Sequence, residues 1–125
     1  MAAELLIVDS ANVVGSVPDG WWRDRAGATR RLRDRLVAVA RAGLPGLPPP
    51  LQVVLVVEGA ARAVTGVPGV RVVPAPGSGD DTIVDLVRAA PPGSCTVVTA
   101  DRALRARVRA AGAQLLAPHA LPRSP

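Results

Sequence analysis

The sequence predicts an α/β domain in which a mostly parallel sheet is covered by helices on both faces. Short apolar runs without polar alternation, such as residues 51–57, are typical of strands buried on both sides. These runs alternate along the chain with longer segments whose apolar residues recur at helical spacing. Buried strands that alternate with helices are typical of a parallel sheet packed between helices.

Turn residues divide the chain into its expected elements. Gly43 and the proline-rich stretch 44–50 end a helix on which Leu32, Leu36 and Val39 share one side. We expect strands over residues 4–8, 51–57, 70–73, 95–99 and 113–116. We expect helices over residues 23–42, 80–90 and 102–111, and a short helix over 60–64.

No internal repeat or change of composition divides the chain, so we expect one domain over residues 1–117. Residues 118–125 are polar and rich in proline, and we expect them to form a flexible tail. No apolar run approaches the ~20 residues of a membrane helix, and the N-terminus lacks the basic region of a signal peptide. We therefore expect a cytoplasmic protein without membrane contact. The single cysteine, Cys95, excludes an internal disulfide and a cysteine-based metal cluster.

The formal net charge of +5 suggests an anionic partner, with nucleic acid the first candidate. All fifteen basic residues are arginine, and alanine, glycine and proline are also abundant. A GC-rich coding sequence produces the same composition. The positive charge by itself therefore does not establish that the partner is a nucleic acid. The sequence leaves the oligomeric state open, a homodimer included.

Acidic residues follow the expected strands at one edge of the sheet. Asp9, Glu58 and Asp101 each come at or just after the end of a strand, where ligands of parallel sheets bind. Residues 77–85 carry three more carboxylates at the start of a helix: Asp80, Asp81 and Asp85. The chain therefore places six of its ten acidic residues at this edge. If a helix begins near residue 80, Asp81 and Asp85 stand at i and i+4 on one face.

Each of these acids also has an ordinary structural explanation. Asp9 suits an Asx-turn, Asp80 or Asp81 suits a helix cap, and Asp101 is a natural N-cap. These explanations do not account for the gathering of so many carboxylates without balancing lysines. Hard oxygen ligands without a His/Cys cluster favour Mg²⁺ or Mn²⁺ over structural zinc. The metal-ligand candidates are Asp9, Asp80, Asp81, Asp85 and Asp101.

Other polar residues at the same edge are candidates for supporting roles. Asn12 is a candidate for orienting a ligand or water through its amide. Side chains that suit a phosphate or the outer shell of the site are Glu58, Thr82, Thr99, Arg102 and Arg105. Candidates for RNA contacts are Trp21, Trp22, Arg23 and Arg30, through base stacking or the RNA backbone. Each of these residues also has a structural alternative. The tryptophans suit the core or a partner interface, and the arginines suit a solvated helix face.

Three segments resemble the acidic motifs of the NYN branch of the PIN-like ribonucleases: residues 7–13, 79–84 and 97–102. That family has a strand-ending Asp followed shortly by Asn, a paired Asp that opens a helix, and a Ser/Thr-x-Asp after the next strand. The resemblance spans nearly the whole chain, although Ser10 stands where glycine is common. It implies a three-layer α/β/α fold and Mg²⁺- or Mn²⁺-dependent RNA cleavage. It also implies that Asp9, Asp80, Asp81 and Asp101 are metal-site acids and Asn12 a polar helper.

The leading functional prediction is a metal-dependent endoribonuclease with Asp9, Asn12, Asp81 and Asp101 as catalytic residues. A hydrolase of nucleotides or small phosphate esters would use the same acids, and a non-catalytic RNA-binding adaptor is a third alternative. An aspartyl-phosphate phosphatase is disfavoured because Ser10 and Ala11 follow Asp9 where Asp-x-Asp is typical. A receiver-type domain needs a lysine, which this chain lacks, and glycine-rich nucleotide fingerprints are absent.

Overall fold

Five strands form one parallel sheet in the computed structural model, which describes residues 4–123. The strands are β1 (Glu4–Asp9), β2 (Leu51–Val57), β3 (Val70–Pro74), β4 (Cys95–Val98) and β5 (Gln114–Leu116). Their order in the sheet is β3-β2-β1-β4-β5, and every neighbouring pair is parallel. The predicted α/β class with a mostly parallel sheet is confirmed.

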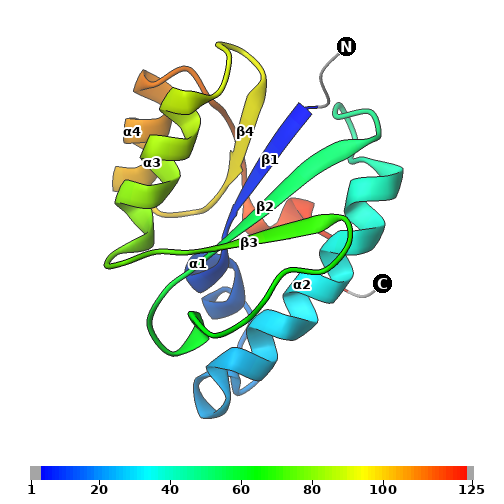
Figure 1. Cartoon of the computed structure of the whole chain (residues 1–125), viewed down its shortest axis with the longest axis vertical. Helices are drawn as coiled ribbons and strands as arrows, with labels where there is room; N and C mark the ends of the chain where they lie inside the picture. Colours follow the sequence, from blue (N-terminus) through cyan, green and yellow to red (C-terminus); the bar gives the residue numbers. More distant parts are fainter. Residues whose placement is uncertain (1–3, 124–125) are drawn as a thin grey trace.

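Helices cover both faces of this sheet. They are α1 (Ser10–Gly15), α2 (Arg25–Ala42), α3 (Gly79–Ala89) and α4 (Arg102–Ala110), with short 3₁₀ turns at Trp21–Arg23, Gly59–Ala61 and Pro118–Ala120. Figure 1 shows α3 and α4 on one side of the sheet and α2 on the other. In the described part of the chain, none of the helices has the length and apolarity to cross a membrane.

The strands separate two hydrophobic cores because successive side chains point to opposite faces. In β1, Leu6 and Val8 pack in the core that α1 and α2 cover, whereas Ile7 packs in the core under α3 and α4. Both cores contain fully buried side chains, which explains why the strands read as unbroken apolar runs.

The helix α1 was not expected, and it follows β1 without a connecting loop. Its six residues include Asn12, two valines and Gly15, which are weak helix formers. The N-cap residue Asp9 compensates, because its Oδ1 accepts the backbone N–H of Asn12 at 3.4 Å. The helix expected over residues 60–64 is a shorter 3₁₀ turn, Gly59–Ala61.

The C-terminal segment packs on the domain over the residues that the structure describes. Pro118–Ala120 form a 3₁₀ turn, and Leu121 is buried in the core beneath α1 and α2. The backbone oxygen of Arg123 accepts a hydrogen bond from Arg35 at 2.8 Å. The flexible tail expected over residues 118–125 therefore does not describe residues 118–123, and the last two residues lie outside the described part.

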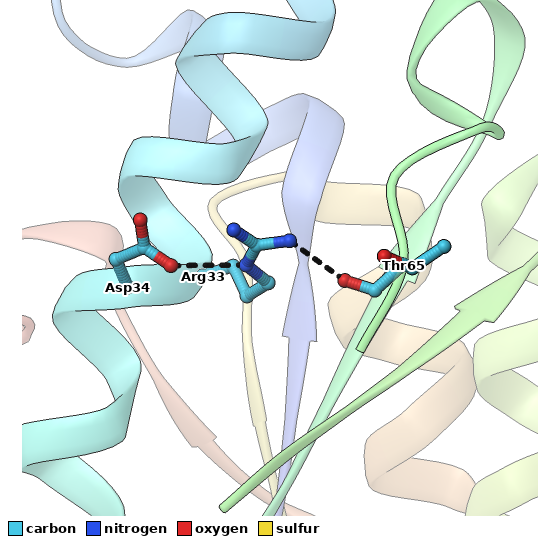
Figure 2. Close-up of polar contacts among 3 residues, drawn as sticks. All are labelled: Arg33, Asp34 and Thr65. Atoms are coloured by element: carbon cyan, nitrogen blue, oxygen red, sulfur yellow. Dashed lines mark hydrogen bonds and ion pairs between the residues drawn. The ribbon is translucent and has the colours of Figure 1, made fainter. Parts of the chain in front are cut away.

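The connection from β2 to β3 contains only a short 3₁₀ turn, and an arginine of α2 fixes it. Figure 2 shows the Arg33 guanidinium between the Asp34 carboxylate and the backbone oxygen of Thr65. The Nε of Arg33 donates to Asp34 at 3.0 Å, and its Nη1 donates to Thr65 at 2.9 Å. This bridge holds the segment before β3 against α2.

Candidate functional site

The site is built around the point where the chain reverses its direction of travel across the sheet. From β1 the chain moves outward to β2 and β3, and it then returns to place β4 on the other side of β1. The crevice at the carboxyl ends of two such strands is the usual ligand position in open α/β sheets. Asp9 ends β1, and Thr99 directly follows β4. The Oγ1 of Thr99 donates to Oδ2 of Asp9 at 2.9 Å, and this hydrogen bond is buried.

Asp9 is an acid held in an unfavourable environment. Only 7% of its surface is exposed. The pKa of Asp9 is raised to about 6, chiefly by burial and also by the negative charges of Asp80 and Glu58, whereas the hydrogen bonds from Thr99 and Asn12 lower it. A buried carboxylate that faces two other acids and no basic partner is a candidate cation ligand.

A hydrogen-bond network fixes the residues on either side of Asp9. The side-chain oxygen of Asn12 accepts the backbone N–H of Ala100 at 2.8 Å, which ties α1 to the loop after β4. The Oγ1 of Thr99 accepts the backbone N–H of Asp101 at 3.1 Å. Asp101 then caps α4, because its Oδ1 accepts the backbone N–H of Leu104 at 2.9 Å. Asp101 is therefore the N-cap that its position suggested, and its Oδ2 lies outside the cap. Both oxygens of Asp9 accept hydrogen bonds, Oδ1 from the backbone N–H of Asn12 and Oδ2 from Thr99.

The start of α3 supplies two neighbouring acids in different environments. Ser78 is the N-cap, with its hydroxyl accepting the backbone N–H of Asp80 at 3.2 Å, so neither aspartate caps this helix. The pKa of Asp80 is raised by burial and by the charges of Asp101 and Glu58, which places Asp80 among the other acids. The side chain of Asp81 is 78% exposed and pairs with Arg107 of α4 at 2.9 Å.

Glu58, which follows β2, joins this group of acids. Its Oε2 accepts the backbone N–H of Gly79, the first residue of α3. A side chain at position 79 would place its Cβ 3.1 Å from that oxygen, so glycine permits the close approach. The sequence suggested only an outer role for Glu58. Its charge acts on both Asp9 and Asp80, which makes it part of the central group.

The remaining edge residues stand outside the hydrogen bonds and charge interactions described above, or support the group indirectly. Asp85 is exposed on α3, and the charges that raise the pKa values of Asp9 and Asp80 come from other acids. Thr82 is half-buried and Arg102 is exposed, and neither takes part in the network around Thr99. Arg105 does contribute, because its Nη1 donates to the backbone oxygen of Thr99 at 2.7 Å.

The tryptophans stand beside the site and not in the core. Trp22 is 58% exposed, and its ring meets the Trp21 ring edge to face with the centroids 5.9 Å apart. The Arg25 guanidinium lies 5.2 Å from the Trp21 ring centroid, a contact that the sequence did not suggest. Trp21, Arg25 and Glu58 line a cavity of about 50 Å³ with Ser10. Arg23 and Arg30 are exposed.

The donor chemistry of the central group suits a hard divalent cation, although the side chains do not converge on one point. Within residues 4–123, no three acidic, histidine or cysteine side chains stand close enough together to hold a metal ion as arranged. Mg²⁺ keeps several waters and takes only one or two direct carboxylates, so it does not need a closed cage. The carboxylates of Asp9 and Asp80, which repel their acidic neighbours, fit such an ion.

Comparison with known proteins identifies similar folds but no family. No family model matches this sequence, and no curated protein sequence matches it either. The crystal structure of Rae1 (YacP) from Bacillus subtilis is similar with a TM-score of 0.74 and 18% identity, over 97% of this chain and 71% of that one. A mutant of Rae1 gives a TM-score of 0.75 and 20% identity, over 94% and 72% of the two chains. At these identities the similarity shows the fold alone.

Proposed function

We propose that this protein is a metal-dependent endoribonuclease that hydrolyses RNA phosphodiester bonds. The observation that carries the proposal is the group formed by Asp9, Glu58, Asp80 and Asp101 at the carboxyl edge of the sheet. Burial and mutual repulsion raise the pKa values of Asp9 and Asp80 in this group. A divalent cation would remove that repulsion, and phosphoryl substrates commonly complete the coordination of Mg²⁺ at such carboxylates.

The residues divide the work according to their contacts. Asp9 and Asp80 would bind Mg²⁺ or Mn²⁺, whose bound form supplies Lewis acidity toward the phosphate and lowers the pKa of water. Asp101 has Oδ1 occupied by its cap, so Oδ2 is the atom we assign to orienting the attacking water. Asn12 has its oxygen occupied by Ala100, so its Nδ2 is the donor for a phosphate oxygen. Glu58 holds the start of α3 in place.

RNA is favoured over a small phosphate ester by what surrounds the acids. Trp22 presents an exposed indole surface against Trp21, which lines a cavity together with Glu58, and the aromatic face suits an unpaired base. The net charge of +5 suits a polyanion. The three motifs that resemble the NYN ribonucleases point to the same substrate class. Hydrolysis of a nucleotide, or RNA binding without hydrolysis, are the alternatives that the experiment must separate.

The test compares substrates, metals and one matched pair of variants. Labelled single-stranded RNA, single-stranded DNA and a nucleoside triphosphate are each incubated with Mn²⁺, Mg²⁺ or EDTA. Asp80→Asn is assayed beside Asp85→Asn, which removes the same charge from an exposed position on the same helix. We expect metal-dependent RNA cleavage that is lost in Asp80→Asn and retained in Asp85→Asn. Triphosphate turnover with intact RNA, or RNA binding without cleavage, would contradict the proposal.

A further inference from the structure

A second cavity lies on the other side of the loop that follows β4. Its volume is about 240 Å³, and its wall combines α1, α2, Ala100 and the C-terminal segment. Leu121 of that segment is buried in the core, so the segment forms a stable wall. The cavity is lined by three basic side chains, Arg35, His119 and Arg123. Its lining contains no acidic residue.

Arg35 enters this cavity with part of its hydrogen-bonding capacity unused. Its Nη1 donates to the backbone oxygen of Arg123 at 2.8 Å. Its Nε is buried, and no acceptor within residues 4–123 pairs with it. Burial lowers the pKa of Arg35, the charge of Arg31 lowers it further, and Asp19 acts in the opposite direction. An unpaired buried donor on a cation is costly. Because this Nε has almost no accessible surface, an anion in the cavity would be bound by the other nitrogens of the guanidinium.

The chemistry of the lining suits a phosphate group. A guanidinium presents its donors as a planar fork that matches two phosphate oxygens. His119 and Arg123 also line the cavity, and their side chains carry further donors. The volume exceeds that of a single water site, which needs only ~10–15 Å³. The cavity is therefore suited to a tetrahedral oxyanion and not to a bridging water alone.

This cavity shares a wall with the acidic edge. Ala100 lines it, and Ala100 lies between Thr99 and Asp101 in the chain. The backbone N–H of Ala100 donates to the Asn12 side chain, so this residue contacts both regions. We propose that the Arg35 cavity binds a backbone phosphate of the RNA strand, next to the phosphate that is cleaved. The assignment of the phosphate to RNA rests on the proposed nuclease function.

The test measures binding without cleavage, so it does not depend on nuclease activity. Affinity for a fluorescent single-stranded RNA is measured in EDTA over a range of salt concentrations, with inorganic phosphate as competitor. Arg35→Gln is compared with Arg41→Gln, which removes the same charge from an exposed position on the same helix. We expect Arg35→Gln to weaken RNA binding about tenfold and to reduce the salt slope by about one, as loss of a phosphate contact does. Arg41→Gln should leave both unchanged.

Each of the following outcomes would overturn the proposal that the Arg35 cavity binds an RNA phosphate. Equal losses in Arg35→Gln and Arg41→Gln would mean that only overall charge matters. An unchanged affinity in Arg35→Gln would exclude the contact, even where wild-type RNA cleavage is intact. Phosphate binding that depends on Arg35 without a matching loss for RNA would make the cavity a free-phosphate site. If Arg35→Gln does not fold by circular dichroism, His119→Gln carries the test, because its side chain is exposed.

Discussion

The two halves of the acidic edge hold their carboxylates in different ways. In the β1–β4 half, which comprises Asp9, Asn12, Thr99 and Asp101, hydrogen bonds link every member to the next element. In the α3 half, which comprises Glu58, Asp80 and Asp81, one acid fixes the helix start, one faces the other acids and one pairs with an arginine in solvent. The first half is preorganised by its backbone contacts, whereas the second depends on how α3 packs.

The β1–β4 half should dominate catalysis. Asp9→Asn removes the buried charge around which the site is built, while Asn retains one oxygen for Thr99 or the Asn12 N–H. Loss of a residue that orients metal ligands costs about 10–100-fold, and loss of the ligand should cost more. We expect RNA cleavage to fall by more than ~100-fold, measured as the initial rate in Mn²⁺. A loss below ~10-fold would show that Asp9 is not central.

The same residue should lower stability at neutral pH when no metal is bound. The folded-state pKa of Asp9 is about 6, above the ordinary value of 3.8 for an aspartate. Its contribution to stability is therefore fully present below about 3.8 and is lost as the pH rises through about 6. The difference corresponds to about 3 kcal/mol at full ionisation. In EDTA, Asp9→Asn should gain stability relative to wild type between pH 4 and pH 7, measured by urea unfolding.

A constant difference between the two unfolding free energies over that range would contradict the burial of Asp9. Added Mg²⁺ should raise the stability of the wild type at pH 7, because it favours the ionised carboxylate. The Asp9→Asn protein should show a smaller rise.

Thr99 tests the hydrogen bonds of the β1–β4 half, with a control in the strand β4 that precedes it. Thr99→Val removes the donor to Asp9 and the acceptor of the Asp101 N–H. We expect a loss of about 1–3 kcal/mol in unfolding free energy and of about 10–100-fold in cleavage. Thr96 is also buried, but its Oγ1 has no partner within the described residues. Thr96→Val should therefore be neutral or stabilising, and equal losses in both variants would refute the assigned role of Thr99.

The smallest effect should come from the exposed pair of the α3 half. Asp81→Asn breaks the ion pair with Arg107, whose side chains are 78% and 45% exposed. Exposed pairs contribute about 0–1 kcal/mol, so the melting temperature should barely change. Cleavage should also change little, because Asp81 points to α4. A loss of cleavage as large as that of Asp9→Asn would show that Asp81 turns inward when substrate binds.

Local patterns were sufficient to predict the sheet and its acidic edge. Unbroken apolar runs predict the strands, and the rule that ligands bind at the carboxyl ends of parallel strands predicts that Asp9 and Asp101 meet at one edge. The same rule places Glu58 at this edge. It does not predict the hydrogen bond from Gly79 to Glu58, which forms because the start of α3 lies against the end of β2. Such contacts are set by the packing of β2 against α3, which spacing within a single element does not reveal.

The sequence alone did not show whether Asp80 or Asp81 faces the other acids of the site. Helical spacing paired Asp81 with Asp85, and that pair lies on the solvent side of α3. The rotation of α3 about its axis places Asp80 among the acids, and this rotation follows from which apolar residues bury themselves, namely Ile83, Val84 and Val87. The partner of Asp81, Arg107, comes from a different helix, so no local pattern indicated it.

Direct measurement of Mn²⁺ binding tests the central claim, that the acidic edge is a divalent-cation site in which Asp9 and Asp80 are ligands. The electron paramagnetic resonance signal of free Mn²⁺ is titrated with wild type, Asp9→Asn, Asp80→Asn, Asp81→Asn and Asp85→Asn. We predict that the wild type and the last two variants bind Mn²⁺ with similar affinity, and that the first two variants lose binding. Absence of binding by the wild type, or equal binding by all five proteins, would contradict the account.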